Sequence, residues 1–203
     1  MFDLKRRRRK RRAGEEFSFR PKKNKFNKHK FFRELRSWLL VTLIAAVCGY
    51  AFVTFCFQTV TVIGPSMRDT LVDGQVVLVN KMAYRIHDVE RYDIIAYSMV
   101  ENDSYYDIKR VIGLPGETLQ IIDGYVYIDG SRLSNLPVEQ VILSCGIANS
   151  PIVLGDNEYF VLGDNVNNSE DSRYTNIGNV TNAEILGRVD RIVSPKSDRE
   201  RFE

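Results

Sequence analysis

The clearest local signal in this sequence is LQIIDGYVYIDG, which runs from Leu119 to Gly130. Short apolar runs, rich in β-branched and aromatic residues, alternate in it with the dipeptides Asp123-Gly124 and Asp129-Gly130. An Asp-Gly pair between two such runs favours the tight turn of a β-hairpin, because both central positions of that turn have positive φ. The sequence therefore predicts antiparallel hairpins in this part of the chain.

Further strand-like runs lie on both sides of this hairpin region. They alternate polar and apolar residues or are rich in β-branched ones, and they cover residues 58–62, 75–80, 93–97, 158–162 and 185–189. No segment after Phe57 has convincing helical periodicity, although Lys81–Asp88 has room for a turn or two. We therefore predict an all-β domain over residues 58–203, which at roughly 150 residues is long enough to bury one core.

A long apolar segment precedes the predicted domain. Residues 38–57, WLLVTLIAAVCGYAFVTFCF, carry no charge over 20 positions, which as a helix cover the roughly 30 Å of a bilayer's hydrocarbon core. This apolar core is longer than the ~7–15 residues of a cleavable signal peptide, and Phe55-Cys56-Phe57-Gln58 offers no small-x-small cleavage site. We expect residues 37–57 to form one uncleaved transmembrane signal anchor, with Trp38 at the membrane interface.

The charge is distributed unevenly along the chain. Residues 1–36 hold 16 Lys and Arg against 4 acidic residues, whereas residues 37–203 hold 13 against 22. Such a basic segment is too charged to fold alone, and a nucleic-acid-binding tail is one interpretation of it. The favoured interpretation is a cytoplasmic flank that contacts anionic lipid, because basic residues beside a membrane span stay on the cytoplasmic side. The domain would then face the outside of the plasma membrane, and no nucleic-acid partner is expected.

The candidate for covalent chemistry is Ser66, in the segment Gly64-Pro65-Ser66-Met67-Arg68-Asp69-Thr70-Leu71 shortly after the span. A serine hydroxyl is a weak nucleophile until a nearby base takes its proton. His29 lies in the basic tail, so His87 is the one imidazole available for a Ser-His-Asp arrangement. Lys109 is the other candidate base, because it opens an apolar run closed by turn residues, and apolar neighbours favour a neutral amine.

Three ordered sequence boxes resemble those of bacterial type I signal peptidases. They are Ser66-Met67 followed by Thr70-Leu71, then Lys109-Arg110-Val111-Ile112-Gly113-Leu114-Pro115-Gly116, and then Gly163-Asp164-Asn165 with Asn168-Ser169-Glu170-Asp171-Ser172-Arg173. The resemblance extends from about Phe57 to Val193. Each box alone is common, whereas all three in this order behind a single membrane span are a strong signal for the membrane-anchored form of this family.

The resemblance implies a serine endopeptidase that uses a serine/lysine dyad. Ser66 would attack the scissile carbonyl, Lys109 would act as general base, and Ser169 matches the hydroxyl that orients the lysine in the family. The implied substrates are exported preproteins, from which the enzyme removes signal peptides after small-x-small sites, with the translocation machinery as a further candidate partner. The implied fold is a set of antiparallel sheets coiled into a partly open barrel.

The resemblance also implies a supporting set of residues. Asp164 would pair with Arg110, and Asp171 with Arg173, so that the third box is held against the strand that carries the lysine. Buried pairs of this kind fix geometry more reliably than they add stability. Gly163 would mark a turn or a close approach of two backbone segments.

Two positions depart from the usual family pattern. Asp69 stands where proline is most common, so the loop loses a φ constraint and gains a side chain that can cap a local turn. Gly64 has no hydroxyl, although some family members use a serine there to help bind the oxyanion. The oxyanion hole would therefore rely on the backbone N–H of Ser66 and on a second donor that the sequence does not identify.

Two alternative interpretations remain open from the sequence, and no metal or cofactor is expected. A self-cleaving peptidase of the SOS-repressor type uses the same dyad, but the membrane span argues against a protein that acts on DNA in the cytoplasm. Outside the enzymes, the alternative is a membrane-anchored β-domain that binds an extracytoplasmic partner without catalysis.

Cys145 is the one cysteine after the apolar segment, so no disulfide can form within the domain. Neither Cys145 nor His87 belongs to a metal-ligand cluster.

Overall fold

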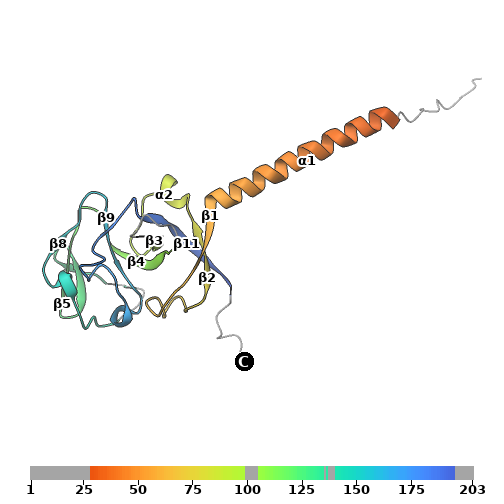
Figure 1. The fold of residues 1–203 in the computed structure, drawn as a ribbon. Helices are drawn as coiled ribbons and strands as arrows, with labels where there is room; N and C mark the ends of the chain where they lie inside the picture. The colour runs from red at the N-terminus through yellow and green to blue at the C-terminus, as the bar shows by residue number, and fades with distance from the viewer. Residues whose placement is uncertain (1–27, 99–104, 135, 137–139, 195–203) are drawn as a thin grey trace, which may run out of the picture. The chain divides into compact units, whose positions relative to one another are not determined.

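A computed structural model describes residues 28–98, 105–134, 136 and 140–194 of the chain. Within it the polypeptide divides into two compact units, the first ending at Ala45 and the second beginning at Ala46. Figure 1 shows the elements along the chain. The first unit contains the N-terminal part of a long helix, and the second contains all of the strands.

The long helix, α1, extends from Lys28 to Cys56 and is long and apolar enough to cross a membrane. This confirms the predicted apolar helix. It begins earlier than residue 37 because the flank before the span is also helical, with Lys30 and Glu34 one turn apart and 3.9 Å from each other, a spacing that supports a helix. Residues 1–27 of the predicted basic tail lie outside the described residues.

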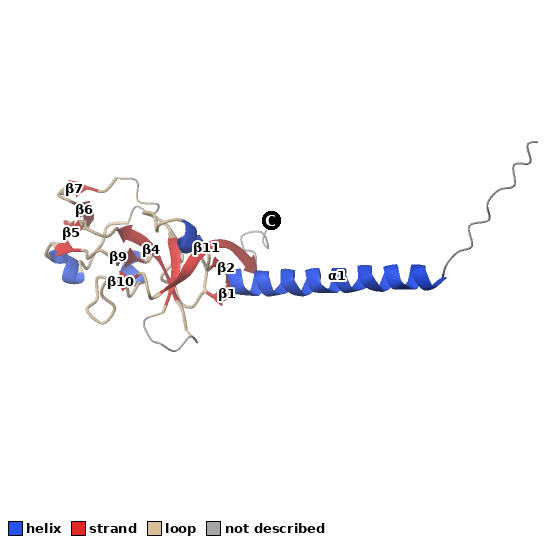
Figure 2. Ribbon diagram, turned by 90° about the horizontal axis from the view of Figure 1, so that it is seen from above, coloured by secondary structure: helices blue, strands red, loops and turns tan. Residues whose placement is uncertain are grey.

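The larger sheet has seven strands, and every neighbouring pair in it is antiparallel. In spatial order they are β1 (Phe57–Thr61), β2 (Val76–Asn80), β11 (Ile185–Ser194), β3 (Ile94–Tyr97), β4 (Asp107–Gly113), β9 (Glu158–Leu162) and β10 (Val180–Thr181). The sheet curls into a half-barrel, as Figures 1 and 2 show. The predicted all-β domain with a partly open barrel is therefore confirmed, and β11 lies between β2 and β3.

The smaller sheet contains the hairpins predicted from the Asp-Gly dipeptides. Its spatial order is β7 (Ser131–Arg132), β6 (Tyr125–Ile128), β5 (Thr118–Ile122) and β8 (Ile152–Val153). Asp123 and Gly124 connect β5 to β6 with φ of 51° and 80°, and Asp129 and Gly130 connect β6 to β7 with φ of 49° and 76°. Positive φ at both central positions is the conformation predicted for these turns, so both hairpins are confirmed.

Short or irregular elements account for what the strand pattern missed. β7, β8 and β10 have two residues each, which is too few to show alternation. The sequence pattern ended this strand at residue 189, whereas β11 continues to Ser194. Register shifts against β2 after Val189 and after Ile192 interrupt the alternation on which the prediction relied. The remaining helices of the described residues are α2 (Ala83–Ile86), which lies in the predicted Lys81–Asp88 turn, η1 (Gly146–Asn149) and η2 (Val166–Asn168).

One apolar face of the larger sheet positions the site. Ile95 and Tyr97 of β3 pack there against residues of β9 and β10. The register of β3 and β4 places Lys109 opposite Ile95 and Asp107 opposite Tyr97. Directly opposite residues point to the same side of a sheet. This apolar face of the sheet therefore carries the side chains of Lys109 and Asp107, which lie next to each other on β4.

Candidate active site

Ser66 lies in the loop between β1 and β2, which is fixed at its base and at the serine. At the base, the Val62 N–H donates to the Gln75 carbonyl at 2.8 Å. At the serine, the backbone N–H of Asn165 donates to the Ser66 carbonyl at 2.9 Å, and the Asn165 side chain donates to the Pro65 carbonyl at 3.1 Å. Since Asn165 follows β9, these bonds hold the serine against the end of that strand.

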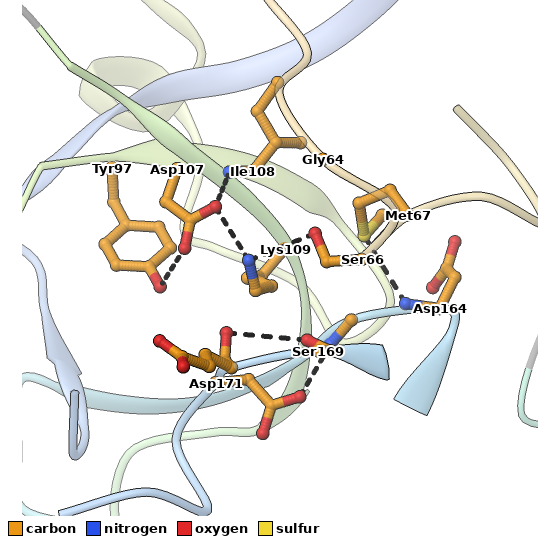
Figure 3. A network of polar contacts seen from close by, with 12 residues as sticks. Gly64, Ser66, Met67, Tyr97, Asp107, Ile108, Lys109, Asp164, Ser169 and Asp171 are labelled. Carbon is orange, nitrogen blue, oxygen red and sulfur yellow. Dashed lines mark hydrogen bonds and ion pairs between the residues drawn. The ribbon is translucent and has the colours of Figure 1, made fainter. Parts of the chain in front are cut away.

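The side chain of Lys109 reaches Ser66 from β4. Its Nζ lies 3.3 Å from the Ser66 Oγ, and only 2% of the lysine side chain is exposed. Figure 3 shows the amine between the serine hydroxyl and the carboxylate of Asp107. The structure thus brings the two predicted catalytic residues, which are 43 positions apart in the chain, to a distance suited to proton transfer.

Asp107 is a residue of this site that the sequence boxes did not single out. Its Oδ1 lies 2.7 Å from the Lys109 Nζ and also accepts the Ile108 N–H at 3.0 Å, while its Oδ2 accepts the Tyr97 hydroxyl at 3.3 Å. Burial and the Asp107 carboxylate raise the pKa of Tyr97 well above its usual value, so this hydroxyl stays protonated. Side chains two positions apart lie on the same face of a strand, so this spacing in the sequence could have indicated that Asp107 lies beside Lys109.

Arg110 forms a buried pair with Asp164, from the end of β9. Its Nε and Nη2 donate to the two carboxylate oxygens at 2.7 and 2.6 Å, which is the bidentate geometry that favours arginine. The hydroxyl of Thr70, from the same loop as Ser66, also donates to Asp164. The pair therefore connects β4, the end of β9 and the serine loop.

Asp171 and Arg173 form a second pair, which is almost fully buried. The Arg173 Nε lies 2.8 Å from the Asp171 Oδ1, and the Asp171 Oδ2 accepts the Gly163 N–H at 3.1 Å. Arg173 also donates to the carbonyl oxygens of Ser144 at 2.9 Å and Ser169 at 3.3 Å. This pair ties the two parts of the third box to each other, at the glycine that directly follows β9.

Gly163 lies where two backbone segments approach each other closely. A Cβ built there would be 2.6 Å from the Ser66 carbonyl oxygen and 2.3 Å from the Ser169 Oγ, so a larger residue does not fit without movement. Ser169 therefore lies beside the serine loop, but its hydroxyl donates to the Glu170 carbonyl at 3.5 Å. No bond from Ser169 to Lys109 is found among the described residues, and its lysine-orienting role stays a prediction.

The other candidate base, His87, is placed differently. It follows α2, where its backbone N–H donates to the Ala83 carbonyl at 3.1 Å, and its side chain is exposed. No hydrogen bond between His87 and Ser66 occurs in the described part of the chain. Among the same residues, no group of three His, Cys, Asp or Glu could hold a metal ion. The geometry thus favours Lys109 over His87 as the base.

A hydroxyl and an amine 3.3 Å apart are the groups that a serine peptidase needs for nucleophilic attack and proton transfer, so the fold and the site fit that class. The family model "Signal peptidase, peptidase S26" matches residues 35–194. Signal peptidase I P of Bacillus subtilis subsp. natto is 31% identical over 171 residues, which are 81% of this chain and 91% of that protein. Signal peptidase I of Bacillus amyloliquefaciens is 34% identical over 157 residues, 74% of this chain and 83% of that protein.

A solved signal peptidase I from Enterococcus faecalis is also similar, with 31% sequence identity and a TM-score of 0.39 over 51% of this chain and 98% of that chain. The family model and the two Bacillus relatives decide the assignment, because the model covers most of the chain and the relatives match it over nearly three quarters or more. The chain belongs to the signal peptidase family, peptidase family S26.

Proposed function

We propose that this protein is a membrane-anchored serine endopeptidase that removes N-terminal signal peptides from exported preproteins, with Ser66 as nucleophile and Lys109 as general base. The observation that carries the proposal is the 3.3 Å separation of the Lys109 Nζ and the Ser66 Oγ, with the lysine buried. The substrate class is supported by membership of the signal peptidase family and by the names of the relatives.

The proposed reaction uses the dyad in two halves. In the first half, the Ser66 Oγ bonds to the scissile carbonyl carbon while the neutral Lys109 amine takes the hydroxyl proton. The C–N bond then breaks, the Lys109 ammonium gives this proton to the leaving amine, and the signal peptide remains as an ester on Ser66. In the second half, Lys109 takes a proton from water, the water oxygen attacks the ester, and the proton returns to the Ser66 oxygen.

The negative charge that develops on the carbonyl oxygen needs nearby hydrogen-bond donors. We assign the backbone N–H of Ser66 as one of them. Gly64 adopts a φ of 84° and its N–H donates to the Asp73 Oδ1 at 2.8 Å. Because side-chain-bearing residues rarely adopt this conformation, the loop does not readily accept the serine that some family members have at this position.

A small hollow beside Gly163 supports a preference for small residues at the cleavage site. Its volume is about 20 Å³, and its lining includes Ile112, Ile142, Leu162, Gly163 and Val166. So narrow a space favours a small side chain over a large one. Discrimination by shape alone is on the order of 1–3 kcal/mol per methylene, so cleavage close to the membrane would add selectivity through local concentration.

We also propose that the N-terminal basic flank is cytoplasmic and that the catalytic domain faces the extracytoplasmic side, next to translocated preproteins and membrane lipid. The excess of Lys and Arg before the span supports this orientation. Protease added outside spheroplasts should digest residues after Phe57 and spare the tail. Protection of the domain would reverse the proposed orientation.

Cleavage of a model preprotein by the full-length protein in liposomes tests the function. The wild type should release the mature protein when small residues occupy the first and third positions before the cut. Ser66→Ala should release none, and a serine-reactive probe should label the wild type but not this variant. Cleavage by Ser66→Ala, or no cleavage by a folded wild type, would contradict the proposal.

A further inference from the structure

Asp107 is a closer partner of the Lys109 amine than the serine is. The Nζ lies 2.7 Å from the Asp107 Oδ1 and 3.3 Å from the Ser66 Oγ. The lysine side chain is 2% exposed and the aspartate side chain 29% exposed. A buried ammonium has lost most of its hydration, so a carboxylate at this distance replaces water as its partner.

The carboxylate is itself held in place. The Ile108 N–H donates to its Oδ1 at 3.0 Å and the Tyr97 hydroxyl donates to its Oδ2 at 3.3 Å. Both donors are fixed by the pairing of β3 with β4, in which Tyr97 is directly opposite Asp107. A carboxylate with little freedom to rotate restricts the position of the amine bound to it.

Phenolic and acidic groups also lie near this pair. Asp171 and Glu184 act electrostatically on Tyr97, and burial together with the Asp107 carboxylate raises the pKa of Tyr105. Asp107 is the one whose carboxylate contacts the amine, and a carboxylate there favours the ammonium form over the neutral amine.

We infer that Asp107 is a positioning residue of the peptidase, which holds the Lys109 amine beside Ser66 and sets the pH range in which that amine can act as a base. The inference rests on the proposed function. The two effects of Asp107 oppose each other, because its oxygen atom places the amine correctly whereas its charge keeps the amine protonated. Cleavage requires the amine that Asp107 holds to be in its neutral form.

The pH dependence of kcat/KM for Asp107 variants separates the two effects. Asp107→Asn keeps the side-chain shape and one acceptor oxygen but removes the charge, so the rising limb of the profile should move toward acid by about one pH unit or more. Its plateau should stay within a few fold of the wild type. Asp107→Ala also removes the acceptor, so its plateau kcat should fall by about 10-fold or more with little change in KM.

Matched variants distinguish these effects from loss of fold or loss of surface charge. Asp156→Asn removes one negative charge from the exposed turn before β9 and should give the wild-type profile. Asp107→Glu keeps the charge but displaces it by one methylene. The rising limb of its pH profile should therefore lie at the wild-type pH, while its plateau kcat falls. Ser169→Ala should lower the plateau kcat less than Asp107→Ala does. Melting temperatures show which variants are folded.

The inference is overturned if folded Asp107→Asn has an unmoved rising limb, if folded Asp107→Ala keeps the full plateau kcat, or if Asp107→Glu shifts the limb as Asp107→Asn does. A loss of about 10²-fold in Ser169→Ala with a minor effect in Asp107→Ala would support Ser169, and not Asp107, as the residue that orients the lysine. Failure of the proposed function is seen separately, because the wild type would then not cleave or Ser66→Ala would cleave.

Discussion

The proposed role of Lys109 requires a side chain that can release its proton, which an amine can do and a guanidinium group cannot. A lysine can lose its proton when its surroundings withhold solvation, whereas an arginine stays protonated in proteins. Lys109→Arg keeps the positive charge and the approximate reach to Ser66 and Asp107. We expect it to reduce preprotein cleavage to background, which the liposome assay measures directly.

His87→Ala is the control for this substitution, because His87 is exposed after α2 and a serine/lysine mechanism uses no imidazole. Its rate should be nearly that of the wild type. If Lys109→Arg were active, the lysine would serve as a fixed charge and not as a base. A folded but inactive His87→Ala would likewise exclude the dyad.

The residues of the site differ in how far the sequence reveals them. Ser66 and Lys109 stand in boxes whose order identifies the family, so both could be chosen before any fold was known. Asp107 stands just before the second box, and its role depends on pairing with Tyr97 of β3, a strand that carries none of the boxes. The reverse holds for Ser169, whose motif position suggests a bond to the lysine that the structure does not contain among the described residues.

At the scale of single elements, the end of β9 tolerates little change. Gly163→Ala would place a Cβ 2.6 Å from the Ser66 carbonyl oxygen, and backbone at that distance must move. A displacement of about 1 Å can cost on the order of 10²-fold in rate, so we expect a loss of kcat of that order. Cleavage kinetics and thermal melting, measured together, separate this loss from unfolding.

Gly155→Ala, before the other end of β9, is the matched control for this effect. There the nearest atom to a new Cβ is the side-chain Cδ of Glu158 at 3.3 Å, and a flexible side chain can adjust. Its kcat should stay close to the wild type. Equal losses in the two variants would show that β9 is generally intolerant and that Gly163 has no particular part in placing Ser66.

Elements were predictable where their signal is local. The Asp-Gly turns specify β5, β6 and β7 through the φ values that these two residues adopt readily. The full length of β11 was not predictable, because its register shifts depend on a partner, β2, about a hundred residues earlier in the chain. Sheet order as a whole depends on such distant pairings, so the sequence indicates strands more reliably than it indicates their neighbours.

At the scale of the whole catalytic unit, the larger sheet consists of two groups of strands joined by β11. The first group is β1 and β2, which enclose the Ser66 loop. The second group is β3, β4, β9 and β10, and its strand β4 carries Lys109. A chain that ends at Glu184 lacks β11 and should neither cleave a preprotein nor unfold cooperatively. A chain that ends at Ser194 keeps β11 and should do both, as cleavage assays and calorimetry can show. Activity in the shorter chain would mean that loop contacts alone hold the serine.

During synthesis the strands become available in chain order, from β1 onward, but the sheet needs its last strand at an interior position. A growing polypeptide therefore contains Ser66 and Lys109 before the strand that joins their two groups of strands has been made. Its proteolytic activity would appear only once β11 has been made, and would not increase gradually with chain length. We expect an unfinished chain to leave unfolded neighbours uncut, and the chain that ends at Glu184 tests this.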